Sequence, residues 1–320
     1  MMMYLGLFGG LVMLALGGDI LIRGAVSLAK GLGLAPLLIG LTVVAFGTSA
    51  PEMIASLRAA YLGAPGIAVG NIMGSNIANI LLILGVAAII TPLTADKKGF
   101  RRDAMALAMS ALFFTLAILL GEANRAWGIM AVVLLIAYII YAYRTGKTHG
   151  EEGVITSEAR FAEKHLRLNV ALMMDASLIL AGFLILGFGG DLLVRSSVSL
   201  AREWGLSETF IGLTIVALGT SAPELVVSIL AAMKRQTDVA LGNIIGSNIF
   251  NVLAVLGVTS IAIPVTIGGG LAGFDIWIML AATVLLMIVA WSEYKVTRVE
   301  GFMLLGCYVT YLGLKLALFL

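Results

Sequence analysis

The chain has 320 residues, of which 61% are hydrophobic and only 12% are charged, and its mean hydropathy is +1.08. A soluble domain carries roughly twice that charged fraction, so the composition excludes a soluble protein and indicates one that spans a membrane many times. The net charge is +2, and the single cysteine, Cys307, excludes an internal disulfide or a cysteine-based metal centre.

Ten apolar runs reach the length of about 20 residues that a membrane-spanning helix needs. They lie at roughly 3–29, 36–62, 66–91, 103–121, 126–143, 170–199, 207–233, 238–264, 273–292 and 300–319. One polar linker, 144–168, separates five runs from five. We therefore predict an all-α integral membrane protein with a first repeat at 1–143, a connecting loop at 144–168 and a second repeat at 169–320.

Both halves carry the same two blocks at a constant offset of 172 residues. GLTVVAFGTSAPE at 40–52 matches GLTIVALGTSAPE at 212–224, and GNIMGSNIANI at 70–80 matches GNIIGSNIFNV at 242–252. Since each half has an odd number of spans, the second must enter the membrane from the opposite side. The sequence predicts two inverted five-helix repeats.

Lysine and arginine are distributed unequally between the two sides of this topology. Fourteen lie on the side that holds the 144–168 linker and three lie on the other, leaving aside those within spans. Positive charge is retained in the cytoplasm. We therefore expect a multi-pass protein of the cell membrane with a cytoplasmic linker and both termini outside.

The second and seventh runs are each predicted to break near the middle. In the second run, Pro51 cannot donate a backbone hydrogen bond and its ring clashes with the preceding turn, so the helix should break at 45–50 and restart near Pro51. Glu52 follows at once, and Glu224 repeats it in the other half. A carboxylate at this depth is costly unless it is neutralised, and two that face one site are balanced by a divalent cation.

The third and eighth runs add polar side chains on one helical face, at i, i+4 and i+8. These are Asn71, Ser75 and Asn79 in one half and Asn243, Ser247 and Asn251 in the other. Gly242 and Gly246 form a small-xxx-small surface, as do Gly70 and Gly74, that allows a close helix approach. Oxygen ligands without thiolate or imidazole suit calcium or sodium.

Each of these features also has a structural interpretation. Ser49 to Glu52 fits a capping box, in which both side chains satisfy the first amides of a helix. The asparagines and serines of the third and eighth runs fit interhelical hydrogen bonding. Asp19 with Arg23, and Asp191 with Arg195, fit charge-compensating pairs four residues apart.

The four blocks together resemble the cation/calcium antiporter superfamily, and most of all its compact prokaryotic sodium/calcium exchangers. The resemblance implies that Glu52 and Glu224 bind calcium with oxygens of Thr48 and Thr220. It implies that sodium uses the same carboxylates with further oxygens. These further oxygens belong to Ser49, Ser75, Ser221 and Ser247 and to the carbonyls of Ala45 and Ala217.

The resemblance further implies that Asn79 and Asn251 line the middle of the site, and that the first and sixth helices slide against the other helices. Many relatives place an aspartate where this chain has Asn251, so only two carboxylates remain, which argues against potassium co-transport.

We therefore expect a sodium/calcium antiporter that works by alternating access, with both ions competing for one site. We expect no enzyme activity, no cofactor and no nucleic-acid partner, and the partners that the sequence indicates are calcium and sodium ions and the lipid bilayer. A proton/calcium antiporter remains open because protons neutralise the same glutamates. A passive cation channel and a scaffold without transport are more distant alternatives.

Overall fold

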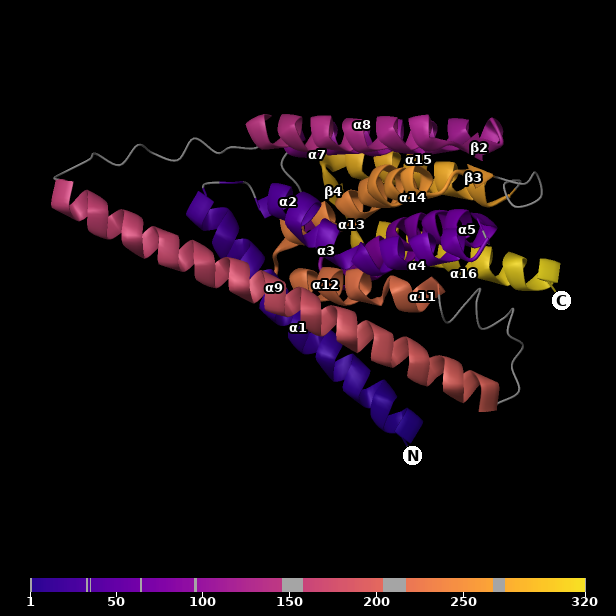
Figure 1. The fold of residues 1–320 in the computed structure, drawn as a ribbon, viewed down its shortest axis with the longest axis horizontal. Coiled ribbons are helices and arrows are strands. Elements are labelled where there is room, and N and C mark those ends of the chain that lie inside the picture. Colours follow the sequence, from indigo (N-terminus) through magenta and orange to yellow (C-terminus); the bar gives the residue numbers. More distant parts are fainter. Residues whose placement is uncertain are drawn as a thin grey trace.

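The computed structural model describes residues 2–32, 34, 36–63, 65–94, 97–145, 158–203, 217–266 and 274–319. Within these ranges the fold is almost entirely helical (Figure 1). Six of the described helices are long and apolar enough to cross a membrane, or seven if the bent pair Leu37–Thr48 and Ala50–Tyr61 is one span. The fold is that of a multi-pass helical membrane protein.

The first half has helices at each of its five predicted spans. They are α1 (Met2–Leu32); α2 (Pro36–Ile39), η1 (Gly40–Val44), α3 (Ala45–Thr48) and α4 (Ala50–Tyr61); α5 (Pro65–Ile77), η2 (Ala78–Ile83) and α6 (Leu84–Ile90); α7 (Lys97–Leu119); and α8 (Arg125–Thr145). The η segments are π-helical, with wider turns than an α-helix. Such segments concentrate at functional sites.

The described elements of the second half follow the same order as their counterparts in the first half. They are α9 (Glu158–Glu203), α11 (Ala217–Thr220), α12 (Ala222–Met233), α13 (Thr237–Phe250), η4 (Asn251–Leu256), α14 (Gly257–Ala262), α15 (Asp275–Glu293) and α16 (Arg298–Phe319). The start of the predicted span 207–233 and linker residues 146–157 lie outside the described residues. Residues 158–168 of the linker are helical, as the beginning of α9. Because α12 and the apolar part of α15 are short of a full span, the number of ten spans stays a prediction.

Two short antiparallel ribbons join the halves. β1 (Leu93–Thr94) pairs with β4 (Lys295–Val296), and β2 (Glu122–Ala123) pairs with β3 (Val265–Thr266). In Figure 1, β2 and β3 lie together at one end of the helices, whereas β4 lies well away from them toward the other end. Since β1 and β3 stand 172 residues apart, corresponding strands of the two halves lie at opposite ends.

α1 and α9 form a closely packed pair that runs obliquely to the other helices (Figure 1). The contact uses glycines at seven-residue intervals, namely Gly10, Gly17 and Gly24 in α1 and Gly182 and Gly189 in α9. A Cβ atom at Gly17 would lie 2.9 Å from the Leu186 nitrogen, and one at Gly182 would lie 2.8 Å from the Leu21 nitrogen. The two backbones are therefore in direct contact, which only small residues permit.

Charged pairs occupy α1 and α9 as the sequence predicts. Arg23 Nε lies 2.7 Å from Asp19, and Arg195 Nε lies 2.8 Å from Asp191. Lys234, just beyond α12, also contacts Asp19. This third member, which the sequence did not indicate, ties the second half of the chain to α1.

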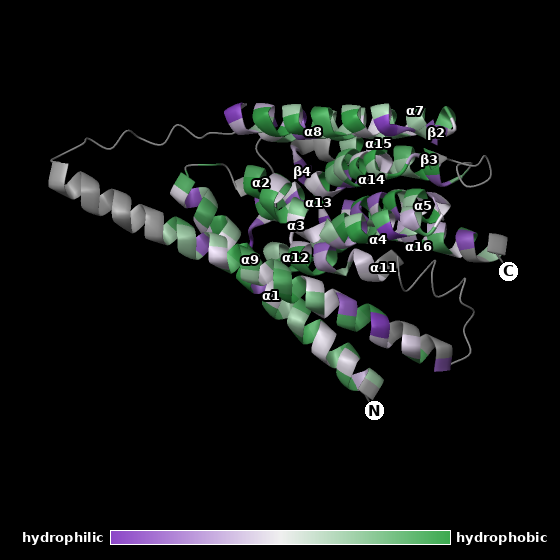
Figure 2. Cartoon of the chain, viewed as in Figure 1, coloured by the Kyte–Doolittle hydropathy of each residue, from purple (hydrophilic) through white to green (hydrophobic). Residues whose placement is uncertain are grey.

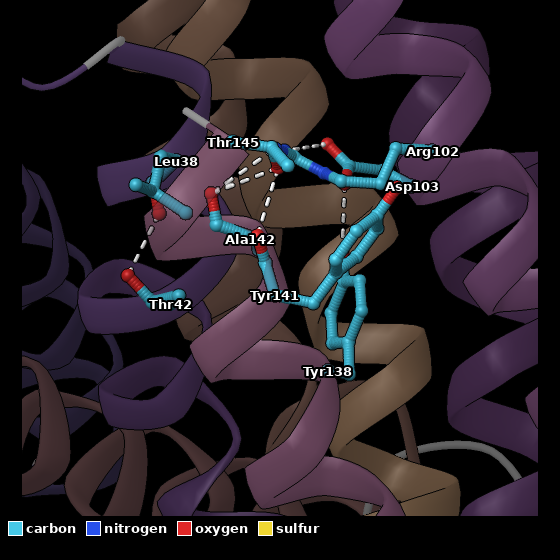
Figure 3. A network of polar contacts seen from close by, with 8 residues as sticks. All are labelled: Leu38, Thr42, Arg102, Asp103, Tyr138, Tyr141, Ala142 and Thr145. Atoms are coloured by element: carbon cyan, nitrogen blue, oxygen red, sulfur yellow. Dashed lines mark hydrogen bonds and ion pairs between the residues drawn. The ribbon is translucent and has the colours of Figure 1, made fainter. Parts of the chain in front are cut away.

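A buried carboxylate connects α7 to α8 (Figure 3). Asp103 is fully buried and accepts hydrogen bonds from Arg102 Nε at 2.5 Å and from the Tyr138 hydroxyl at 3.0 Å. Arg102 also reaches the Ala142 carbonyl at 3.1 Å and Thr145 Oγ1 at 2.9 Å. These contacts fix the angle between the two helices at one end.

We expect Tyr138→Phe to destabilise the protein by about 2 kcal/mol, because a hydrogen bond to a buried charge contributes roughly that much. Unfolding titrations in mixed micelles would measure the loss. Tyr141→Phe is the control, since the Tyr141 ring is exposed and the hydrogen bond that Tyr141 forms with a described side chain, that of Thr145, uses its backbone carbonyl. Equal stability of the two variants would contradict the role of Tyr138.

Candidate functional site

The predicted break in the first half is confirmed at a single residue. Helix α3 ends at Thr48 and α4 begins at Ala50, with Ser49 between them in a non-helical conformation. The two segments meet at 41°, and Pro51 occupies the first turn of α4, where its missing N–H is not needed. Ser221 separates α11 from α12 in the same conformation. Both bends place a glutamate in the first turn of the new helix.

The capping-box interpretation is wrong, because neither Ser49 nor Ser221 forms a side-chain cap. Each hydroxyl instead reaches the glutamate of the other half. Ser221 Oγ donates to Glu52 Oε1 at 2.9 Å, and Ser49 Oγ donates to Glu224 Oε1 at 3.2 Å. Both carboxylates are only 1% exposed. The structure thus brings the two predicted glutamates to one buried place, held by reciprocal contacts.

The threonines of the two blocks follow the same crossed pattern. Thr48 Oγ1 lies 3.2 Å from Asn243 Oδ1, and Thr220 Oγ1 donates to Asn71 Oδ1 at 3.4 Å. Helix α13 therefore packs against the bend of the first half, and α5 packs against the bend of the second. All four side chains lie beside the glutamates but already have protein partners.

Asn71 and Asn243 have further partners that fit their structural interpretation. Asn71 Nδ2 donates to Ser56 Oγ at 3.0 Å and to the Glu52 carbonyl at 3.2 Å. Asn243 Nδ2 donates to Ser228 Oγ at 3.0 Å. Ser56 and Ser228 are 172 residues apart and buried. These two asparagines therefore join neighbouring helices and orient the threonines.

Ser75 and Ser247 contact residues of the two bends. Ser75 Oγ lies 3.1 Å from Ser221 Oγ, and Ser247 Oγ lies 3.4 Å from Thr48 Oγ1. The Ala45 carbonyl accepts from the Ser49 amide at 3.0 Å, so it is not left free by the bend. Ala217 is the first residue of α11, and its side-chain surroundings lie outside the described residues.

Several buried oxygens near the bends lack a hydrogen-bond partner among the described residues. They are Glu52 Oε2, Glu224 Oε2, Asn79 Oδ1, Asn248 Oδ1 and Asn251 Oδ1. Each would be costly to leave unpaired in a buried place. These five oxygens come from both halves, and Asn79 Nδ2, Thr259 Oγ1 and Ser260 Oγ also lack a partner among the described residues. Such a set fits a hard cation, which binds carboxylate and amide oxygens.

Asn76 and Asn248 belong to this polar centre but were not singled out from the sequence. Asn251 Nδ2 donates to Asn76 Oδ1 at 3.2 Å, and Asn248 Nδ2 donates to the Ile244 carbonyl at 2.7 Å. Both residues occupy the same place in the duplicated GSN motif, and that duplication is the signal that could have found them.

Close packing behind the site confirms the predicted small-residue surface of α13 but not that of α5: a Cβ atom at Gly70 or Gly74 would meet no described atom within 4 Å, and residues 204–216 lie outside the described part of the chain. A Cβ atom at Gly242 would lie 2.4 Å from the Leu37 carbonyl oxygen, and one at Gly246 would lie 2.4 Å from that of Leu41. The described part of the chain has no cluster of three or more His, Cys, Asp or Glu side chains able to hold a metal ion. Neutral oxygens must therefore supplement the two glutamates in any cation site here.

Comparison with known proteins gives a consistent result. The family model described as "Sodium/calcium exchanger protein" matches residues 2–145 and 175–317. The chain is 33% identical to the sodium/calcium exchanger MaX1 of Methanosarcina acetivorans, over 97% of each protein. It is 28% identical to the Ca(2+)/H(+) antiporter ChaA of Bacillus subtilis, over 84% of this chain and 80% of that protein. A structure of the sodium-calcium exchanger NCX_Mj superposes with a TM-score of 0.85 at 28% identity, over 98% of each chain.

Proposed function

Because the chain belongs to the sodium/calcium exchanger protein family, we propose that it exchanges sodium for calcium at one site between Glu52 and Glu224. The observation that carries this proposal is the pair of buried carboxylates held by reciprocal serine contacts. Each keeps one oxygen without a partner among the described residues. Two such charges are stable together only with a cation or a proton bound.

We assign calcium to the two glutamates, with Thr48 and Thr220 supplying further oxygens. Sodium, with half the charge, would use the same carboxylates together with neutral oxygens. These are the hydroxyls of Ser49, Ser75, Ser221 and Ser247 and the carbonyls of Ala45 and Ala217, while Asn79 and Asn251 would line the middle of the site. The contacts that Ser221 and Ser75 make around Glu52 support this division.

Competition for the carboxylates would couple the two fluxes. Moving two bare carboxylates through a closed state is costly, so the protein would change conformation chiefly when they are neutralised. The glycine-packed pair α1 and α9 would slide as one unit past the site. Exchange of several sodium ions for one calcium ion would move net charge and respond to voltage.

We further propose ten spans in two inverted repeats, with helices 2 and 7 broken at Ser49 and Ser221. The crossed contacts at the site support this arrangement, as does the position of corresponding strands at opposite ends. In a cell membrane, the linker 144–168 would face the cytoplasm and both termini would face outward.

Calcium uptake into proteoliposomes tests the exchange. Purified protein is reconstituted with sodium inside, diluted into sodium-free medium containing calcium, and clamped at equal pH on both sides. We expect uptake that follows the sodium gradient and stops when the gradient is collapsed. If calcium uptake failed under a sodium gradient but occurred under a proton gradient, the counter-ion would be the proton and not sodium.

The similarity to a Ca(2+)/H(+) antiporter supports one alternative, in which protons and not sodium ions exchange for calcium. A proton needs only the carboxylates, whereas sodium needs the surrounding hydroxyls as well, and these hydroxyls contact both glutamates here. A channel would be recognised by calcium flux that continues without any counter-ion.

We expect Ser221→Ala to raise the sodium concentration for half-maximal exchange several-fold while calcium affinity changes less. The reason is that the Ser221 hydroxyl contacts both Glu52 and Ser75 and would be a sodium ligand. The measurement is uptake at varied sodium and calcium. Ser177→Ala is the control, because Ser177 is exposed on α9 and donates to the Met173 carbonyl. An equal loss of both affinities would argue against a separate sodium ligand.

A further inference from the structure

A groove on the membrane-facing side of α7 and α8 lies apart from the ion site. Its volume is about 640 Å³, within the usual range for ligand pockets. Its apolar lining comes mainly from Met105, Met109, Leu112 and Leu116 of α7 and Leu134 of α8, with Leu253 of η4 contributing as well. Met109 is 65% exposed, so the groove is open toward the bilayer.

One face of α7 carries both the lining of the groove and a basic group at its mouth. Lys98, Arg102, Met105, Met109, Leu112 and Leu116 follow at intervals of four and three residues, which places them on one side of the helix. Figure 2 shows that α8 is hydrophobic along most of its length and hydrophilic at the end that leads toward residue 146. Arg144 lies in that last turn.

The mouth of the groove is strongly positive. Five basic side chains lie at this end of the two helices, whereas Asp103 is the one acidic residue within α7 and α8 themselves. The five are Lys97, Lys98, Arg101, Arg102 and Arg144. Arg102 neutralises Asp103 and ties α7 to α8, which keeps the mouth in shape (Figure 3). Lys98 and Arg144 are exposed at the level where lipid headgroups meet the protein.

We propose that this groove binds an anionic phospholipid, with its phosphate at Lys98 and Arg144 and one acyl chain along the Met105–Leu116 face of α7. Charge complementarity favours this occupant, since basic pockets between membrane helices bind anionic headgroups. A second copy of the chain, docked on the same groove in the same membrane orientation, would bring two such basic ends together. Their like charges would repel, which disfavours this occupant. The bilayer supplies the lipid, and no free phosphate is required.

Native mass spectrometry of the purified full chain tests the proposal. The delipidated protein is mixed with phosphatidylglycerol or phosphatidylcholine with identical acyl chains, and bound lipid is counted. We expect preferential binding of phosphatidylglycerol. The double variant Lys98→Gln/Arg144→Gln should weaken that binding about thirtyfold, because each basic residue near the surface contributes roughly fivefold. The matched control is Arg58→Gln/Arg125→Gln, exposed arginines away from this end, which should bind as the wild type does.

A second variant separates the groove from surface charge. Met109→Trp should fill the groove and lower phosphatidylglycerol binding several-fold without changing the preference over phosphatidylcholine. Met303→Trp, on an exposed face of α16, should have no effect. Equal binding of the two lipids, equal losses in both charge variants, or unchanged binding by Met109→Trp would each overturn the proposal. So would a dimer that Met109→Trp dissociates, because a second copy would then occupy the groove.

Discussion

Replacing Glu52 with glutamine is expected to lower sodium-driven calcium uptake by a hundredfold or more, and Glu224→Gln is expected to do the same. Each carboxylate is buried, and its Oε1 accepts from a serine of the other half. Removing one charge halves the negative charge that faces the ion. Loss of one partner from a buried charge interaction costs about 3–5 kcal/mol, which corresponds to roughly two to four powers of ten in affinity.

The stability of the same variants distinguishes a lost ion site from a lost fold. Without a bound ion, two buried carboxylates repel each other, so Glu52→Gln should leave the ion-free protein as stable as the wild type or more so. Calcium should raise the melting temperature of the wild type but not that of the variant, because a ligand stabilises only a protein that binds it. Glu203→Gln, at the exposed end of α9, is the control. Normal calcium transport by Glu52→Gln would remove the basis of the exchanger assignment.

The elements that were predicted correctly depend on local chemistry or on repetition. Pro51 cannot continue a helix, and the bend lies at Ser49, inside the predicted range. Asp19 and Arg23 pair because four residues form about one helical turn. The duplicated blocks predicted that Glu52 and Glu224 meet, and the structure places them together.

What the sequence did not predict depends on which side chain reaches which partner across the interface. A capping box and a contact with the opposite glutamate require the same serine at the same position, so Ser49 alone does not distinguish them. The π-helical segments η2 and η4 have no sequence signal of their own. They begin at Ala78 and Asn251. Lys234 reaches Asp19 only because α12 packs beside α1.

The second large effect is expected from Gly246→Ala, a change of one methyl group behind the site. Its Cβ atom would lie 2.4 Å from the Leu41 carbonyl oxygen and 2.7 Å from the Ala45 Cβ atom. These are backbone and short side-chain atoms that cannot rotate away, so α13 must move outward. We expect a loss of about 3 kcal/mol in the free energy of unfolding, which is at the upper end of the destabilisation that extra atoms usually cause in a well-packed core.

That displacement should also weaken ion binding, because α13 carries the next residue, Ser247, toward Thr48 of the bend. Unfolding titrations and calcium affinity, measured on the same preparation, should therefore both change. Gly306→Ala is the matched control, because it places a methyl group on the exposed face of α16 with no described atom within 4 Å. If Gly246→Ala were as stable and as active as Gly306→Ala, then α13 would have to tolerate an outward shift. In that case the rigid contact between α13 and the bend would not determine the geometry of the site.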